Sequence, residues 1–337
     1  MRAAEPASQR YRLLLALGGI ALGLGMLWGA FQITDLADVR QAMTGLRWPL
    51  VLAAGATYWA GMALRVLRWH GLLKALRPVS RPLVGELLLC GYAMNNLLPA
   101  RLGELFRADL AKRRLGLSRT TVLCSIVVER VLDLTAILLC LALGLLTFIP
   151  PAGASATLDF GRMLVQAALL VGVILAGVVW LMRGALSSAR LPSMAQRLLA
   201  DLRTGLKALG PRNALPLTVL TAAIWTAEAS ALALMFAALG EPLSAPAALI
   251  AISTASLSTL VPTAPAYIGS FQLVFATVMP TLGVPAPVGI AASGLVQLCL
   301  LGSATLVGLL LMLRRAVHND GTVVPPMAPS DARNQSG

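Results

Sequence analysis

Long apolar runs with few charges constrain the fold of this chain more than any other feature. Runs of about 20 residues are long enough to cross ~30 Å of hydrocarbon as helices. Only 12% of the residues are charged, against about 25% in soluble domains. The sequence therefore predicts an all-α integral membrane protein with about six transmembrane helices, at Leu13–Phe31, Trp48–Leu67, Thr121–Ile149, Met163–Met182, Leu215–Leu239 and Val288–Leu313.

The first apolar run has two interpretations. It follows three arginines, as the apolar region of a signal peptide does, but it is long for one and no small-x-small cleavage site closes it. We therefore expect a retained helix, with residues 1–12 in the cytoplasm.

The positive charges lie between alternate apolar runs. If the N-terminus is inside, 23 of the 27 Lys and Arg residues fall in inner segments, and such a bias sets the orientation of a membrane protein. We expect a multi-pass membrane protein with both termini cytoplasmic. Because the arginines follow this topology pattern, the net charge of +13 does not indicate nucleic-acid binding.

Two apolar regions do not fit as simple spans. Residues 82–100 have cations on both flanks, so this region should enter and leave the membrane on the inner side as a re-entrant helical element. Residues 246–282 should do the same from the outer side, because Glu241 is the single charge between residues 241 and 287. Each region is broken by Pro and Gly, as the discontinuous helices of transporters are.

The two re-entrant elements divide the chain into similar halves. Residues 13–149 and 162–313 show the same order of elements, beginning on opposite sides of the membrane. This order predicts a 3+3 inverted-topology repeat, and such repeats place the substrate at their interface. The alternative is two unrelated turns that use the same helix breakers.

The segments outside the two membrane bodies are polar or basic. Residues 183–212 alternate cations with leucines, which predicts an amphipathic helix on the inner surface; a plain cytoplasmic linker is the alternative. The tail at residues 314–337 is polar and Pro-rich, and we expect it to be disordered.

The inner break supplies the first candidate site residues. Backbone that is not helical survives at membrane depth only where protein or a water-filled cavity satisfies its polar groups. We expect Pro99 and Gly103 to lie in such a place, with Asn95 and Asn96 donating hydrogen bonds to exposed carbonyl groups.

Three charges follow the inner break. Arg101 can bind a phosphate in a bidentate manner, and a helix that restarts near Gly103 would aim its N–H groups at an anion. Glu104 and Arg107 are three residues apart and can pair. The alternative is that all three are ordinary interfacial charges.

Glu129, Arg130 and Asp133 lie in an otherwise apolar run. An unpaired charge at the bilayer centre costs about 2.5–3.5 kcal/mol on insertion scales, so the three should pair or line a polar cavity. Arg130 and Asp133 can pair with each other, and Glu129 needs Arg101 or Arg107. A structural ion-pair cluster and a substrate site both remain open.

The second half contributes fewer charges. Glu228 is the lone acid inside a span, and it is either a proton-accepting carboxylate or a helix-packing contact. Gln272 occupies the place that Glu104 holds in the first half. The remaining candidates belong to the outer break: Pro262, Pro265, Tyr267 and Gly269.

The sequence carries no catalytic signature. It has no phosphate-binding Gly loop, no nucleophile–base pair at an informative spacing, and no CxxC pair among its four cysteines. We therefore expect neither a cofactor nor a metal site.

The inner motif resembles the lysylphosphatidylglycerol synthase transmembrane (flippase-like) family. It reads Asn-x-x-Leu-Pro-x-Arg-x-Gly-Glu-x-x-Arg from Asn95 to Arg107, followed by Glu-Arg-x-x-Asp from Glu129. The family's second motif, Pro-x-x-Pro-Gly-Gly-x-Gly-x-x-Glu, is matched at Pro262, Pro265 and Gly269. Ala266 and Tyr267 replace its Gly pair and Gln272 replaces its acid, which leaves an acid-dependent outer step without its acid.

The resemblance implies a membrane protein that moves or holds lipids. The chain ends before the aminoacyl transferase domain of the two-domain members, so lipid aminoacylation is not expected. We expect a translocase of the cell inner (plasma) membrane for an anionic phospholipid or a polyprenyl-phosphate-linked lipid, with membrane lipids as its partners and a homo-oligomer as a further possibility. Arg101 and Arg107 would hold the phosphate from the inner side, with Glu104 and Glu129 orienting them. The alternatives are a membrane-embedded transferase acting on a lipid carrier and a scaffold for envelope-lipid synthesis.

Overall fold

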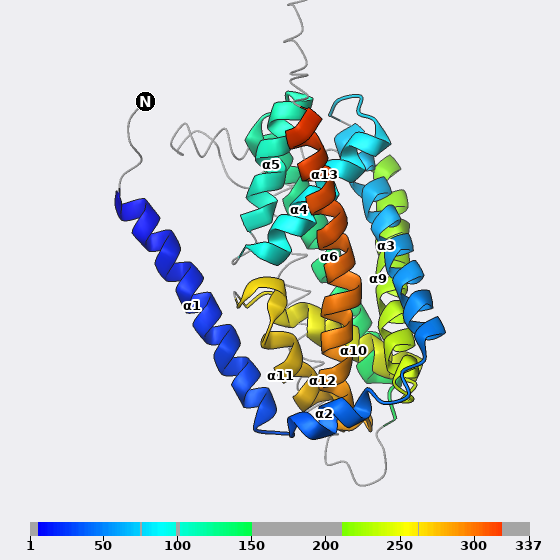
Figure 1. The fold of residues 1–337 in the computed structure, drawn as a ribbon. Helices are drawn as coiled ribbons and strands as arrows, with labels where there is room; N and C mark the ends of the chain where they lie inside the picture. Colours follow the sequence, from blue (N-terminus) through cyan, green and yellow to red (C-terminus); the bar gives the residue numbers. More distant parts are fainter. Residues whose placement is uncertain (1–5, 75, 99–101, 150–210, 262, 319–337) are drawn as a thin grey trace, which may run out of the picture.

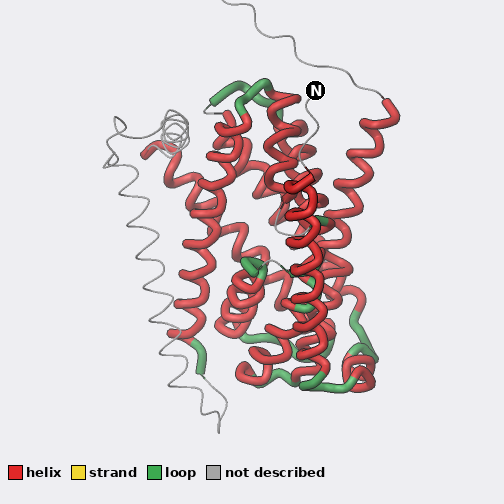
Figure 2. Tube along the Cα trace, turned by 90° about the vertical axis from the view of Figure 1, so that its left-hand side faces the viewer, coloured by secondary structure: helices red, strands yellow, loops and turns green. Residues whose placement is uncertain are grey.

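A computed structural model of the chain describes residues 6–74, 76–98, 102–149, 211–261 and 263–318. Within these ranges all regular structure is helical, and short loops join the helices (Figures 1 and 2). The predicted all-α fold is confirmed. The expected span Met163–Met182, most of the linker at residues 183–212 and most of the tail lie outside the described residues.

The first half forms five helices after the N-terminal one. A bend of 79° separates the apolar part of the first helix from the short second helix. The elements are α1 (Pro6–Phe31), α2 (Leu36–Ala42), α3 (Trp48–Lys74), α4 (Arg81–Leu97), α5 (Leu102–Leu115) and α6 (Arg119–Thr147).

The second half has one interrupted helix at its end. A π-helical segment, η5, lies between α12 and α13. The elements are α9 (Pro211–Ala238), α10 (Ala245–Ser258), the short helix η3 (Pro265–Tyr267), α11 (Ser270–Val278), η4 (Met279–Leu282), α12 (Ala286–Leu295), η5 (Val296–Leu301) and α13 (Gly302–His318).

Three described helices are long and apolar enough to cross a membrane: Trp48–Lys74, Ala214–Ala238 and Ala286–Val317, with the bent α1–α2 pair as a fourth candidate. Helix α6 has 29 residues, or about 43 Å, but it carries the Glu129–Asp133 charges. The total number of spans therefore stays a prediction.

Helix α3 runs past its expected end. The sequence placed the end of this span at Leu67 and counted Arg65 and Arg68 as inner-loop cations. Both arginines lie inside α3 and are buried, with 8% and 0% of their surface exposed. Both side chains have acidic partners on other helices, so they belong to the helix rather than to a loop, and their place in the count of inner cations stays a prediction.

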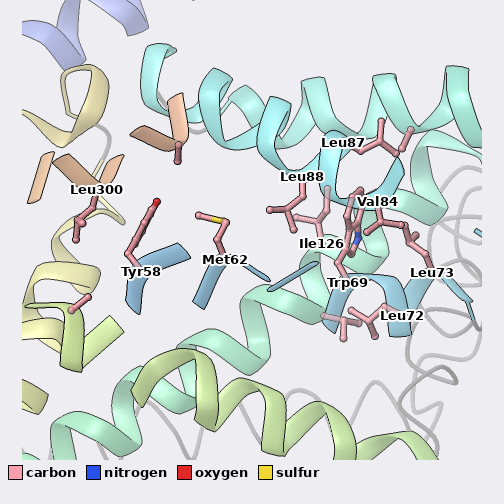
Figure 3. Packing of buried hydrophobic residues seen from close by; sticks show 14 of the residues in the cluster. Tyr58, Met62, Trp69, Leu72, Leu73, Val84, Leu87, Leu88, Ile126 and Leu300 are labelled. Atoms are coloured by element: carbon pink, nitrogen blue, oxygen red, sulfur yellow. The ribbon is translucent and has the colours of Figure 1, made fainter. Parts of the chain in front are cut away.

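The main core forms where α3, α4 and α6 meet. Trp69 of α3 is fully buried, and it lies among Val84, Leu87 and Leu88 of α4 and Ile126 of α6 (Figure 3). The indole N–H of Trp69 donates to the Ser125 hydroxyl over 3.1 Å. This core fixes the first half around the charged residues described below.

Each half contains a helical hairpin that turns back near the middle of the molecule. Helices α4 and α5 pack together in one half of the molecule, and α10 and α11 pack together in the opposite half (Figure 1). Helix α4 contacts η3, so the two hairpin tips meet. The α4–α5 hairpin is called the inner hairpin below, and the α10–α11 hairpin the outer hairpin. The inner hairpin continues beyond residue 100, the limit expected from the sequence, because α5 forms its second arm.

The contacts between helices have the pattern of an inverted repeat. Helix α3 packs on α9, α4 packs on α13, and α10 packs on α6. If α3 is exchanged with α9, α4 with α10, and α6 with α13, the α3–α9 contact stays the same and the other two contacts replace each other. A glycine lies at each of these last two crossings. Where α13 crosses α4, a Cβ on Gly308 would lie 2.5 Å from the Leu89 carbonyl oxygen. Where α6 crosses α10, a Cβ on Gly144 would lie 3.0 Å from the Pro246 carbonyl oxygen. This pattern supports the repeat.

Candidate functional site

A cavity of about 310 Å³ lies between the two halves, at the place where the hairpin tips meet. Its walls come from both halves. The candidate residues that line it are Asn95, Asn96, Gly103, Glu104, Arg107, Arg130, Asp133, Glu228 and Tyr267. The structure thus brings most of the candidates to one place.

The other candidates lie elsewhere. Glu129 is buried behind the cavity wall with 1% of its surface exposed. Pro265, Gly269 and Gln272 belong to the outer hairpin and lie outside the lining. Pro99, Arg101 and Pro262 fall outside the described residues, so their roles stay predictions.

Asn96 donates hydrogen bonds to the end of the π-helical segment and to the helix that follows it. Its amide Nδ2 donates to the Leu301 carbonyl over 3.3 Å and to the Thr305 hydroxyl over 2.8 Å. This is the kind of contact that the sequence predicted for the asparagines. Asn95 differs, because its Oδ1 is buried and accepts no hydrogen bond from the described residues.

Arg68 is the central cation of the site. Its guanidinium is bonded to Asp133 in a bidentate manner, with Nη1–Oδ1 at 2.6 Å and Nη2–Oδ2 at 3.1 Å, and it also donates to Thr221 over 3.1 Å. The Trp225 indole donates to Asp133 over 3.3 Å. Because both charges are buried, these hydrogen bonds are needed to offset their desolvation.

Arg107 is held on two sides. Its Nη2 lies 2.5 Å from Glu129 Oε2, and its guanidinium carbon lies 4.3 Å from the centre of the Trp69 ring. The side chain is 5% exposed. The sequence allowed Arg107 as the partner of Glu129, and this pairing is confirmed, whereas the alternative pairing of Arg107 with Glu104 is not the one formed.

Arg130 is held more loosely. Its closest distances are 3.6 Å to Glu104 and 3.4 Å to Asp133, well beyond the 2.7–2.9 Å usual for a charge-assisted hydrogen bond. Its side chain is 36% exposed, and its Nε has no hydrogen-bond partner among the described residues. Among the described cations that line the cavity, Arg130 therefore has the most capacity to bind something else.

The charges form an open chain of six alternating groups. Arg68 also lies 3.7 Å from Glu129, which joins the Arg107 pair to the Asp133 pair. The chain of charges begins and ends on α5 and runs through Glu104, Arg130, Asp133, Arg68, Glu129 and Arg107. It ties α5, α6 and α3 together and carries no net charge.

A separate ion pair joins the two halves. Arg65 Nη1 of α3 lies 2.5 Å from Glu228 Oε1 of α9, and both line the cavity. Arg65 and Arg68 are the functional candidates that the sequence analysis missed. The signal that could have found them is the excess of acids within the apolar runs. Glu228 stands alone, and Glu129 and Asp133 share one neighbouring arginine, so cations from another helix were needed.

The outer hairpin has an uncharged counterpart of the Glu104–Arg130 contact. Gln272 Oε1 accepts from the Gly269 N–H over 2.8 Å, and Gln272 Nε2 donates to Gln297 Oε1 over 2.6 Å. Gln297 in turn donates to the Ala266 carbonyl over 2.9 Å. The sequence analysis assigned Gln272 the position that Glu104 holds in the first half. In the structure, Gln272 forms a neutral amide pair with Gln297, and this pair joins α11 to η5.

Much of the remaining cavity wall is apolar. Tyr267 stacks on Phe271, with ring centres 5.8 Å apart. The second half supplies Ile252, Leu257, Leu260, Phe271, Phe275 and Leu300 to the lining, and the first half supplies Leu134 and Ile137. Most of the charged lining comes from the first half, with Glu228 from the second. The cavity therefore combines charged and apolar surface, which suits an amphipathic molecule.

Comparison with protein families agrees with this architecture. The family described as the lysylphosphatidylglycerol synthase TM region matches residues 16–308. The chain belongs to this family. The membership confirms the resemblance drawn from the two motifs. The chain is accordingly a multi-pass membrane protein of a lipid-handling kind. None of the curated proteins compared with it matches.

The structure explains the Gly pair in the second motif of the lysylphosphatidylglycerol synthase TM family. Ala266 and Tyr267, which replace the pair here, have φ angles of 54° and 60°. Left-handed backbone costs residues other than glycine roughly 1–2 kcal/mol each. This chain therefore carries backbone strain at the outer hairpin tip, next to the cavity.

Ala266→Gly is expected to stabilise the protein by about 1 kcal/mol, because glycine relieves the left-handed strain. The measurement is the thermal unfolding temperature of the purified protein in detergent. Ala56→Gly in α3 is the matched control, and it should destabilise by about 1 kcal/mol because Ala56 is helical. Equal losses in both variants would contradict the assignment of strain to Ala266.

Proposed function

We propose that this protein binds a phosphate-bearing lipid and moves it across the cell inner membrane. The observation that carries the proposal is the cavity between the two halves, which joins a wall of ion pairs to an apolar wall. A phosphate headgroup fits the first wall and the start of the acyl chains fits the second. The interface of an inverted repeat is also where transporters place their substrates.

Arg130 is the residue proposed to bind the phosphate. The sequence analysis proposed Arg101 and Arg107 for this role, but Arg107 is committed to Glu129 and stacked on Trp69. Arg130 lines the cavity, is partly exposed and has only long contacts to its acids. A guanidinium binds phosphate in a bidentate manner. Arg101 lies outside the described residues, and the proposal does not depend on it.

The two hairpins suggest the route. Their tips meet beside the cavity, so a movement of either hairpin would open the cavity toward one side of the membrane. The charges belong to the α4–α5 side, which the distribution of cations places toward the cytoplasm. We propose that the headgroup is gripped from the cytoplasmic side and passed toward the neutral outer hairpin.

The transferase alternative receives less support. Acid–base chemistry needs a carboxylate that can take up or release a proton. The four acids in or beside the cavity, Glu104, Glu129, Asp133 and Glu228, each lie within 4 Å of an arginine nitrogen. Their arrangement favours binding over catalysis.

Arg130→Gln is expected to slow lipid movement by roughly 10–100-fold, since a hydrogen bond to a charged group contributes about 1.5–3 kcal/mol. The measurement is dithionite quenching of fluorescent phosphatidylglycerol in vesicles that contain the purified protein. Arg119→Gln is the matched control, because Arg119 lies on the same helix and is 48% exposed in a pair with Asp109. Unchanged rates for correctly folded Arg130→Gln protein would contradict the proposal.

A further inference from the structure

A long contact at the end of the chain of charges joins α5 to α6 at the cavity. Glu104 lies in the first turn of α5, and its contact with Arg130 spans 3.6 Å. One turn later, Arg107 joins the same helices through its 2.5 Å contact with Glu129. The two links on α5 therefore differ: one is loose and lines an open cavity, and the other is short and buried.

We propose that Glu104 is an internal competitor of the lipid phosphate, and that phosphate binding at Arg130 releases the N-terminal turn of α5. This inference rests on the proposed function. Glu104 here is a positioning residue, because it acts through Arg130. Its carboxylate holds the place of the phosphate when the cavity contains no lipid, and it keeps α5 against α6.

Charge and distance together favour the exchange. Arg130 lies between two carboxylates at 3.6 and 3.4 Å, so neither makes a hydrogen bond of normal length with it. A phosphate that enters the cavity offers oxygens that can approach to about 2.8 Å. Asp133 cannot leave, because Arg68 and Trp225 hold it. Glu104, which is 24% exposed, is the carboxylate that gives way.

The packing of α5 limits how far the released turn can move. Arg107 is held between Glu129 and Trp69, so α5 stays attached to α6 and α3 one turn beyond Glu104. The buried Oδ1 of Asn95, which accepts no hydrogen bond from the described residues, lies against this first turn at Gly103. A shift of the turn would let a polar group or water reach this atom.

The outer hairpin lacks this exchange. Its corresponding link is the 2.6 Å hydrogen bond between Gln272 and Gln297. Both amides are neutral, and each one donates and accepts a hydrogen bond, so this link offers an anion no cation to compete for. We therefore expect the inner hairpin, and not the outer one, to respond to phosphate.

The experiment measures amide hydrogen exchange of α5 in the full chain in maltoside detergent. The probe is dihexanoyl phosphatidylglycerol, and dihexanoylglycerol, which lacks the phosphate, is its control. In the wild type we expect several-fold faster exchange in the first turns of α5 with the probe alone. In Glu104→Gln we expect fast exchange without any probe, together with about fivefold tighter binding of the probe, because the competing ion pair is gone.

Two further variants keep the result interpretable. Asp109→Asn removes another α5–α6 ion pair, of 3.0 Å to Arg119 and outside the cavity lining, and it should leave probe binding and its effect on α5 unchanged. Glu104→Asp keeps the charge, and it should bind the probe more weakly than Glu104→Gln does.

The outcomes separate the two proposals. If the probe binds the wild type but α5 exchange does not change, the competitor role of Glu104 is wrong while the lipid site stands. Weaker binding in Glu104→Gln than in the wild type also overturns the inference. If the probe does not bind the wild type at all, the proposed function fails, and the inference fails with it.

Discussion

Arg68→Met is expected to destabilise the protein by about 3–5 kcal/mol, the usual cost of removing one partner of a buried ion pair. Arg68 has no exposed surface, and it bonds Asp133 through both Nη atoms. Its loss would leave Asp133 and Glu129 as neighbouring buried carboxylates without their shared cation. The apparent unfolding temperature in detergent should fall by about 10 °C.

A second change and a control make this result specific. Arg68→Met combined with Asp133→Asn should recover part of the loss, because the double variant no longer buries an uncompensated charge. Arg119→Met removes an exposed cation and should cost less than about 1 kcal/mol. Equal effects of Arg68→Met and Arg119→Met would show that the chain of charges is not a buried network.

Gly103→Ala is expected to be the second severe change, at about 3 kcal/mol or more, because it overpacks the tip of the inner hairpin. A Cβ at this position would lie 2.3 Å from the Asn95 backbone nitrogen and 2.4 Å from the Gly91 carbonyl oxygen. These are backbone atoms, so no side-chain rotation relieves the contact. Helix α5 must move away from α4, which disturbs Glu104 and Arg107 as well.

The matched control for Gly103 is Gly55→Ala in α3. A Cβ there meets no described atom within 4 Å, and alanine is the better helix former by about 1 kcal/mol. Unfolding temperatures of the two variants should therefore move in opposite directions. A Gly103→Ala protein as stable as the wild type would contradict the close approach of α4 and α5.

Local chemistry made much of the fold predictable. The apolar runs, the Pro and Gly breaks and the three acids in apolar surroundings led to an all-α membrane protein with two hairpins and a charged cluster. Asn96, Glu129 and Asp133 have the kinds of partner that their surroundings demanded. The family resemblance rested on the same residues and is confirmed by the match over residues 16–308.

The partners across helices were not predictable in the same way. Arg65 and Arg68 looked like inner-loop cations because a charge count along the chain does not include distant acids. The pairing of Glu104 with Arg130 also depends on how α5 packs on α6, and helical spacing alone favoured Arg107. The left-handed backbone at Ala266 and Tyr267 was hidden because neither residue type favours that conformation.

The most direct test of the lipid site is a structure of the protein in nanodiscs that contain phosphatidylglycerol. The account predicts a lipid in the cavity between the hairpins, with a phosphate oxygen about 2.8 Å from the Arg130 guanidinium and Glu104 turned away from it. A cavity without lipid, or a headgroup bound elsewhere while Arg130 keeps its contact with Glu104, would contradict the account.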